Sequence, residues 1–307
     1  MELRGVKTQK TLGMNTIATH CENESWNFLS FYDRELRRAP IRESTRSNQR
    51  STLKQLETYC PTLTFEALNR NFVIAFARHL DLQGYHPNTV AKHLRHLKRY
   101  INLAMERGEM QSSSHPFIGY RIKTLETFRQ YLTMNEIVGL ERLHLSARQG
   151  RLKQARDAFV FCCFTGLRYS DFVSLTPACF SLEGKQLWLT YRSVKTQTLV
   201  RLPLNLLFSG RAVTILNRYK ENVAAFFSLP HNSNLNKLLV KLGRLASIDK
   251  PISFHTARHT NAVQLLHSGV CLSAIQKLLG HRNIRTTQHY AQMLDVTLIR
   301  ELEKVTW

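Results

Sequence analysis

The sequence has few acidic residues and no long apolar run. Its 307 residues include 22 Asp and Glu against 43 Lys and Arg, which gives a formal net charge of +21. The strongest apolar run, residues 158–167, is well short of the roughly 18 residues that a membrane-spanning helix needs. The amino-terminal residues also lack the apolar stretch of a secretory signal. We therefore expect a cytoplasmic protein with no membrane partner.

Paired cysteines are also lacking. The chain contains no Cys-x-x-Cys pair, which argues against a zinc site and against a disulfide framework. We expect its six cysteines to be reduced and to serve mostly in packing. They are Cys21, Cys60, Cys162, Cys163, Cys179 and Cys271.

The basic excess predicts a polyanionic partner. Residues 1–110 carry 17 basic and 11 acidic side chains, and residues 111–307 carry 26 and 11. The electric field of such a positive charge attracts nucleic acid or an anionic membrane surface, and the lack of a membrane segment favours nucleic acid. The hydrophobic content of 43% is ample for packed cores, and the length suggests two domains.

The first 110 residues predict a helical domain behind a polar tail, residues 1–14. Helices are expected from Asn15 onward, over residues 44–59, from Thr64 to before Gly84, and from Pro87 to Met105. In the last of these, apolar residues recur at steps of three and four and form a buried stripe. Basic side chains occupy its outer faces: Lys92, Arg95, His96 and Arg99.

Residues 111–116 are small and polar and end in a proline, which predicts a linker between residues 15–110 and residues 117–307. Helices are expected after it over residues 134–145, 152–164, 212–227, 234–246, 256–268 and 273–279. Residues 187–191 and 199–204 are rich in strand-forming side chains and predict a hairpin. The expected fold class is mainly α, with a small antiparallel β-sheet in the second domain.

Four short strings in the second domain carry the chemistry. They are Thr165-Gly166-Leu167-Arg168-Tyr169-Ser170-Asp171, then Lys195-Thr196, then His255-Thr256-Ala257-Arg258-His259, and finally Leu278-Leu279-Gly280-His281 with Tyr290 nine residues after the histidine. Their order and spacing resemble the tyrosine recombinases, or phage integrases, over nearly the whole chain. The resemblance implies a helical, SAM-like core-binding domain before a catalytic domain. About 14 residues precede the first predicted helix, so we expect no arm-binding domain of the kind some phage integrases have.

The resemblance implies cleavage of a DNA phosphodiester. Arg168 and Arg258 would bind the phosphate oxygens through guanidinium groups that stay charged at neutral pH. Tyr290 would attack phosphorus and form a 3′-phosphotyrosyl bond, with His255 as its candidate base. His281 would donate a hydrogen bond to the phosphate. With cations in these roles, no metal and no cofactor is implied.

Lys195 matches the lysine that the family uses as general acid for the 5′ oxygen, with Lys185, near the other end of the same strand, as an alternative. Asp171 and His259 are expected as supporting residues that orient or contact the reacting groups. His255 and His259 are four residues apart, a spacing that also suits two metal ligands, but the glutamate of the metalloprotease pattern is absent. Tyr169 and Tyr191 remain rival hydroxyl groups.

The expected partner is double-stranded DNA, bound by the basic face of the first domain and by the catalytic domain. The candidate contacts are Lys92, Arg95, His96 and Arg99, with Gln49, Arg50 and Lys54 on the preceding helix. A solvated helix face is the competing interpretation of such charges.

By resemblance we expect a homo-tetramer on two DNA sites, whose subunits are joined by the C-terminal tail 291–307. Accessory DNA-bending proteins are further expected partners, and the protein is expected at the nucleoid. The activity would be integration, excision or inversion of DNA. A type IB topoisomerase and a catalytically silent DNA-binding regulator remain alternatives.

Overall fold

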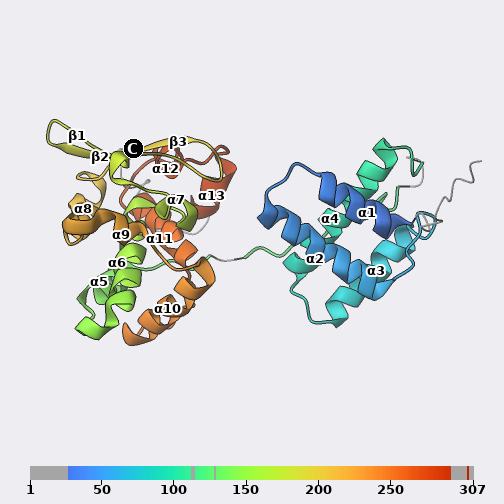
Figure 1. Ribbon diagram of the computed structural model, residues 1–307, viewed down its shortest axis with the longest axis horizontal. Helices are drawn as coiled ribbons and strands as arrows, with labels where there is room; N and C mark the ends of the chain where they lie inside the picture. Colours follow the sequence, from blue (N-terminus) through green and yellow to red (C-terminus); the bar gives the residue numbers. More distant parts are fainter. Residues whose placement is uncertain (1–26, 112–114, 128, 292–302, 304–307) are drawn as a thin grey trace, which may run out of the picture. The chain divides into compact units, whose positions relative to one another are not determined.

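The computed structural model describes residues 27–111, 115–127, 129–291 and 303. The chain divides into two compact units, residues 1–127 and 128–307. Both are mostly helical, and the second contains a three-stranded antiparallel sheet (Figure 1). The predicted fold class is confirmed. The predicted tail 1–14, and the C-terminal tail apart from residues 291 and 303, lie outside the described residues.

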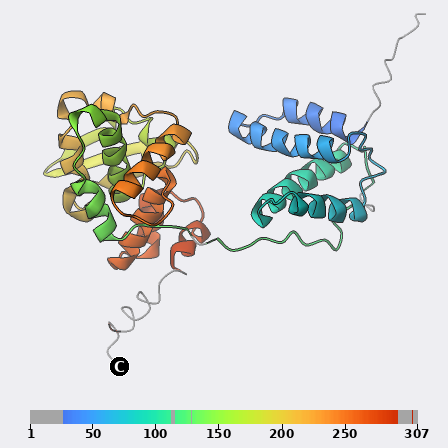
Figure 2. The same cartoon turned by 90° about the horizontal axis from the view of Figure 1, so that it is seen from below.

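In the part of the first unit that the structure describes, four helices pack together: α1 (Phe28–Arg38), α2 (Glu43–Tyr59), α3 (Arg70–Leu82) and α4 (Pro87–Glu106) (Figures 1 and 2). Asn27 and Asn69 cap α1 and α3, each accepting a hydrogen bond from the backbone N–H three residues ahead. The third helix therefore begins at Arg70 and not at Thr64 as expected, because residues 64–68 form turns.

The first unit extends past the predicted linker. Phe117 is buried in the core of this unit. Farther along, the amide of Asn88 at the start of α4 exchanges two 2.9 Å hydrogen bonds with the backbone of Leu125. These bonds attach residues 117–125 to the first unit, so its boundary falls at residue 127 and not within residues 111–116.

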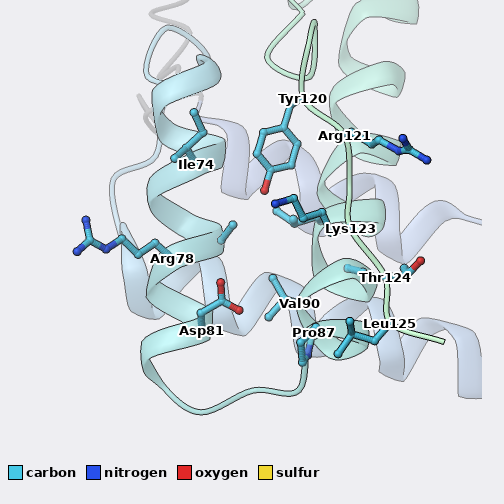
Figure 3. A pocket seen from close by; sticks show the side chains of 13 residues that line it. Ile74, Arg78, Asp81, Pro87, Val90, Tyr120, Arg121, Lys123, Thr124 and Leu125 are labelled. Atoms are coloured by element: carbon cyan, nitrogen blue, oxygen red, sulfur yellow. The ribbon is translucent and has the colours of Figure 1, made fainter. Parts of the chain in front are cut away.

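The attached segment forms one wall of an open pocket of about 500 Å³ (Figure 3). Ile74 and Val90 line it from α3 and α4, and Tyr120 and Lys123 line it from the segment. All of its lining residues belong to the first unit.

The second unit is centred on α6 and α11, whose side chains are buried on nearly every face. Its helices are α5 (Met134–Arg142), α6 (Gly150–Thr165), α7 (Tyr169–Phe172), α8 (Arg211–Asn217), α9 (Val223–Phe227), α10 (Asn232–Leu245), α11 (Phe254–His267), α12 (Leu272–Leu279) and α13 (Arg285–Ala291). The helix expected over residues 212–227 is two helices, because the side chain of Asn222 caps a new one at Val223.

The sheet has the order β1 (Phe180–Glu183), β2 (Gln186–Arg192), β3 (Leu199–Pro203). The hairpin of β2 and β3 was predicted, and β1 was not. Leu189 and Leu202, partners across the hairpin, are both buried in the core. The turn between β2 and β3 lies beside α7, where Asp171 accepts a hydrogen bond from the Val194 N–H, and beside the end of α12, where Gly280 lies close to Val200. None of the described helices is both long and apolar enough to span a bilayer.

Two glycines end helices next to the motif residues. Gly166 follows α6 with φ +71°, and Gly280 follows α12 with φ +62°. A Cβ at Gly166 would lie 2.5 Å from Leu279 and 2.7 Å from Asn261, and one at Gly280 would lie 2.6 Å from Val200. The backbone conformation and the close neighbours therefore both require glycine at these positions.

We predict that Gly166→Ala destabilises the chain much more than Gly184→Ala. Gly184 has a similar φ, +62°, but a Cβ there would have no neighbour within 4 Å. Both variants incur about 1–2 kcal/mol of backbone strain, and only Gly166→Ala adds about 1–3 kcal/mol from overpacking. Urea unfolding of the two variants and the wild-type chain measures the difference. Equal losses of stability would show that the contacts around Gly166 relax at no cost.

Candidate active site

Arg258 lies at the centre of the second unit, on α11. Its side chain is 1% exposed. One guanidinium nitrogen donates to the carbonyl of Gly166 at 2.7 Å, and another donates to the carbonyl of Leu279 at 2.5 Å. Arg258 therefore connects the end of α6 to the end of α12, and it brings three of the four motif strings together.

Arg168 follows the turn at Gly166 and precedes α7. Its Nη1 lies 3.2 Å from the hydroxyl of Ser193 and 3.5 Å from a carboxylate oxygen of Asp171. The side chain is 14% exposed. Part of the guanidinium is thus accessible to an anion, while the rest is held by neighbours.

Asp171 is fully buried and binds the turn that carries Lys195-Thr196, the remaining motif string. Its carboxylate accepts a 2.8 Å hydrogen bond from the backbone N–H of Val194 and lies 3.3 Å from the hydroxyl of Ser193. The resemblance implies that this carboxylate orients a histidine and an arginine. Its ion pair with Arg168 agrees with the arginine part of this expectation, whereas its described hydrogen bonds are with the turn between β2 and β3 and not with a histidine.

Lys195 is exposed on that turn, which is closed by a hydrogen bond from the Ser193 N–H to the Thr198 carbonyl at 2.9 Å. Its positive charge contributes to lowering the pKa of His255, so the two side chains are within electrostatic range. Lys185 is at the opposite end of β2. The seven residues of that strand separate the two lysines by roughly 23 Å.

His281 follows Gly280 and is nearly buried. Its Nδ1 lies 2.8 Å from the hydroxyl of Thr287 on α13. A hydrogen bond donated by Thr287 to Nδ1 leaves the ring proton on Nε2. In that tautomer, His281 presents an N–H donor on the side away from α13.

Tyr290 is carried by α13 and is 2% exposed. Its hydroxyl lies 3.0 Å from Nδ1 of His259, and the two rings are 5.6 Å apart. His255, one helical turn earlier on α11, is exposed and lies edge-on to His259 at 4.5 Å. The histidine in contact with the tyrosine is therefore His259, and not His255.

Burial and surrounding cations keep the three histidines neutral. The pKa of His259 and that of His281 are each lowered to about 3, first by burial and then by neighbouring charges that include Arg258. The pKa of the more exposed His255 is lowered to about 4 by partial desolvation and by the cations around it. Burial also lowers the pKa of Arg258 to about 10, which leaves it charged at neutral pH.

Tyr290 remains a protonated phenol. Burial raises its pKa, although the positive charges of Arg258, Arg129 and Arg168 act in the opposite direction. Arg129 was not selected from the sequence. It lies in an irregular segment far from the motif strings, yet its charge also acts on all three histidines. Only the fold reveals this proximity.

Of the rival hydroxyl groups, that of Tyr169 donates a 2.9 Å hydrogen bond to the carbonyl of Pro230. Tyr191 is buried in β2, and the charges of Asp171, Arg258 and Arg168 act on it as well. Among the described residues, no group of three or more His, Cys, Asp or Glu side chains is arranged to hold a metal ion.

The candidate DNA-binding residues of the first unit lie on α2 and α4, which pack together. Exposed or half-buried side chains are presented by Arg50, Lys54, Lys92, Arg95, His96 and Arg99. Gln49 is different: it is 3% exposed, and its amide oxygen accepts a 2.7 Å hydrogen bond from the hydroxyl of Tyr100. Gln49 therefore belongs to the core of the unit and does not join the basic surface.

Family comparisons cover most of the chain. A model described as the Phage integrase family matches residues 131–296, and a model of the Phage integrase SAM-like domain matches residues 27–122. The tyrosine recombinase XerD of Listeria innocua is 26% identical over 256 residues, which is 76% of this chain and 81% of that protein. The tyrosine recombinase XerC of Rickettsia prowazekii is 41% identical over 73 residues, 24% of this chain and 23% of its own length.

Solved structures share the fold. A lambda integrase dimer bound to a COC′ core site matches with a TM-score of 0.72 at 17% identity, covering 86% of this chain and 93% of that one. The Tn1549 transposon integrase in complex with circular intermediate DNA matches with a TM-score of 0.71 at 17% identity, covering 91% of this chain and 99% of that one.

We predict that acid destabilises the folded chain through these histidines. The unfolded chain binds protons at His281 below about pH 6.5, whereas the folded chain does so only near pH 3. The contribution of neutral His281 to the free energy of unfolding is therefore fully present above pH 6.5 and is lost as the pH falls. For one such group the loss is about 2 kcal/mol between pH 7 and 5.

Urea unfolding at pH 7, 6 and 5 checks this prediction. His281→Gln should lose less stability over that range than the wild type, whereas His144→Gln, at an exposed position, serves as the matched control. An unchanged pH dependence in His281→Gln would contradict the assignment.

Proposed function

Because the chain belongs to the phage integrase family, we propose that it is a site-specific DNA recombinase in which Tyr290 cuts and rejoins the strands. This role is supported by the buried hydroxyl of Tyr290, which contacts His259 and is acted on by the charges of Arg258 and Arg168. A phenol in such a site attacks phosphorus and forms a covalent 3′-phosphotyrosyl bond. That bond stores the energy of the broken phosphodiester, so rejoining needs no nucleotide cofactor.

Arg168 and Arg258 bind the non-bridging oxygens of the scissile phosphate. A guanidinium group presents several N–H donors in one plane and keeps its charge, which suits a phosphate whose negative charge grows in the transition state. His281 adds a neutral N–H donor from Nε2. Asp171 fixes Arg168 relative to the turn that carries Lys195. Arg168 can therefore bind the phosphate while Lys195 lies near the leaving oxygen.

Lys195 protonates the departing 5′ oxygen. Support comes from its place on the turn held by Asp171 and from its charge acting on His255. Lys185 is too far along β2 to reach the same phosphate.

The basic surface of the first unit also contributes to DNA binding. Arg50, Lys54, Lys92, Arg95 and Arg99 contact phosphates of the duplex, with His96 at the same face. Each phosphate contact releases counterions, so affinity falls steeply as salt rises. Gln49 is left out of this proposal because it is buried.

The assembly is a homo-tetramer on two DNA sites. Lambda integrase, which shares the fold, has been solved as a tetramer bound to a Holliday junction. We extend that arrangement to this chain, with accessory DNA-bending proteins as partners at some sites, and with the nucleoid in the cytoplasm as its location. Exchange between two sites separates this activity from the relaxation of supercoils by a type IB topoisomerase.

We predict that Tyr290→Phe binds DNA as the wild type does and forms no covalent adduct. Removal of one hydroxyl leaves the basic surface intact and deletes the nucleophile. A denaturing gel of protein mixed with nicked DNA from around its own gene checks this. A persistent adduct in Tyr290→Phe would reassign the nucleophile.

We predict that Lys195→Ala cleaves slowly, by about 10²–10⁴-fold, because the 5′ oxygen leaves without a proton. A substrate with sulfur in place of that oxygen has a better leaving group and should restore cleavage. Lys185→Ala is the matched control and should cleave both substrates at wild-type rates. Rescue of Lys185→Ala in place of Lys195→Ala would move the general acid.

A further inference from the structure

A buried polar group joins α2 to α4, the two helices that carry the basic surface of the first unit. The hydroxyl of Thr52 on α2 lies 2.8 Å from Nδ1 of His93 and 2.8 Å from Nδ1 of His96, both on α4. Thr52 is fully buried, His93 is 2% exposed and His96 is half-buried. One hydroxyl group thus connects a histidine of the core to a histidine of the basic surface.

The two histidines cannot play the same part in this group while Thr52 donates to one of them. A hydroxyl group has a single hydrogen, and a neutral imidazole has one nitrogen that donates and one that accepts. If Thr52 donates to Nδ1 of one ring, the other ring must donate its own Nδ1–H to the hydroxyl oxygen. The tautomers of His93 and His96 are then opposite, and they change together.

We propose that His96 binds a DNA phosphate as an imidazolium and that Thr52 is the residue that positions it for this contact. The inference rests on the proposed DNA-binding role of the first unit. A protonated ring carries hydrogens on both nitrogens, so Nδ1–H donates to Thr52 while Nε2–H donates to a phosphate oxygen. Thr52 then gives its own hydrogen to Nδ1 of His93, and every hydrogen bond of the group is kept.

His96, and not His93, is the ring that takes up the proton. His93 is almost fully buried, where a cation is costly, and its pKa is lowered to about 4 by burial first and then by the charges of Lys92 and His96. Its ring is packed edge-on against Tyr85, with the centroids 5.9 Å apart. His96 is half-buried among the basic side chains, so solvent and DNA reach it directly.

The groups around His96 come from three helices. On α4, burial lowers the pKa of His96, and the charges of Lys92 and Arg99 lower it further. From α2 it contacts Thr52, and the hydroxyl of Tyr32 on α1, which also faces Thr52, stays protonated because burial raises its pKa. The described charges that act on His96 are therefore cations, and the ring is neutral at pH 7 while no anion is bound.

A bound phosphate opposes these cations. Its negative charge raises the pKa of His96 in the complex above that in the free chain, so DNA binding takes up a proton. Affinity then rises as the pH falls toward the pKa of His96 in the complex, by at most about tenfold per pH unit for one proton. The group of Thr52, His93 and His96 thereby makes DNA affinity depend on pH.

The first test measures the affinity of the whole chain for a duplex from around its own gene, at fixed salt, between pH 8 and 6. We expect wild-type affinity to rise over this range by about three- to tenfold more than that of His96→Gln, because glutamine takes up no proton. Protons taken up by histidines of the second unit are the same in both chains and cancel. His144→Gln, at an exposed position in the second unit, is the control and should follow the wild type. Equal gains in the wild type and His96→Gln would overturn the proposal.

Thr52→Ser and Thr52→Val test the positioning role. Serine keeps the hydroxyl group and should keep the wild-type pH dependence. Valine has a similar shape without the hydroxyl, so Nδ1–H of a protonated His96 would face a methyl group. The gain in affinity at pH 6 should then fall to that of His96→Gln. A Thr52→Val chain with wild-type pH dependence would show that Thr52 only packs, and it would overturn the positioning role.

Nitrogen-15 NMR of the histidine rings tests the same group in the wild-type sequence, including the case in which Thr52→Val does not fold. At pH 8, Nδ1 should carry a hydrogen in one of His93 and His96 and not in the other. Addition of the duplex at pH 7 should convert His96, and not His93, to the imidazolium. Hydrogens on both Nδ1 atoms at pH 8, with Thr52 donating to Tyr32, would overturn the proposal, and so would a neutral His96 in the complex.

Failure of the underlying function gives a different result. A chain that binds the duplex at no pH would refute the proposed DNA-binding role of the first unit, and this inference with it. Wild-type affinity of His96→Gln at every pH would leave that role intact and refute only the contact of His96 with phosphate.

Discussion

The second unit depends on the hydrogen bonds of the buried Arg258 guanidinium. A buried cation is costly unless its donors are satisfied, and here two backbone carbonyls, at Gly166 and Leu279, accept from it. Those carbonyls stand at the ends of α6 and α12, where left-handed glycines turn the chain toward Arg168 and His281. The arginine thus holds in place the two turns that carry Arg168 and His281, the other groups proposed to bind phosphate.

The electrostatics of the site follow from the same arrangement. Arg168, Arg258 and Arg129 lie near one another with Asp171 as a buried carboxylate. The histidines respond by staying neutral, and the tyrosine stays protonated because it is buried. An anion would relieve the repulsion among the cations. This arrangement favours an anion such as the phosphate that we propose as its substrate.

The sequence predicted the family, the mainly helical fold and the hairpin because these depend on local patterns and motif spacing. It did not predict α13, since residues 285–291 lack an apolar stripe and this helix packs against α11 and α12. The burial of Gln49 could likewise not be predicted from the polar sequence of α2, because it depends on a hydrogen bond from Tyr100 on α4. Arg129 and the contact of His259 with Tyr290 are products of tertiary packing, and no motif encodes them. The roles of the site residues remain predictions.

The most direct test is to identify the residue that becomes linked to DNA. The wild-type protein would be trapped on a nicked substrate containing its own recombination site, digested with protease and nuclease, and sequenced by mass spectrometry. We predict a nucleotide attached through a 3′ phosphate to Tyr290 alone. A nucleotide on Tyr169, on Tyr191 or on any other side chain would contradict it.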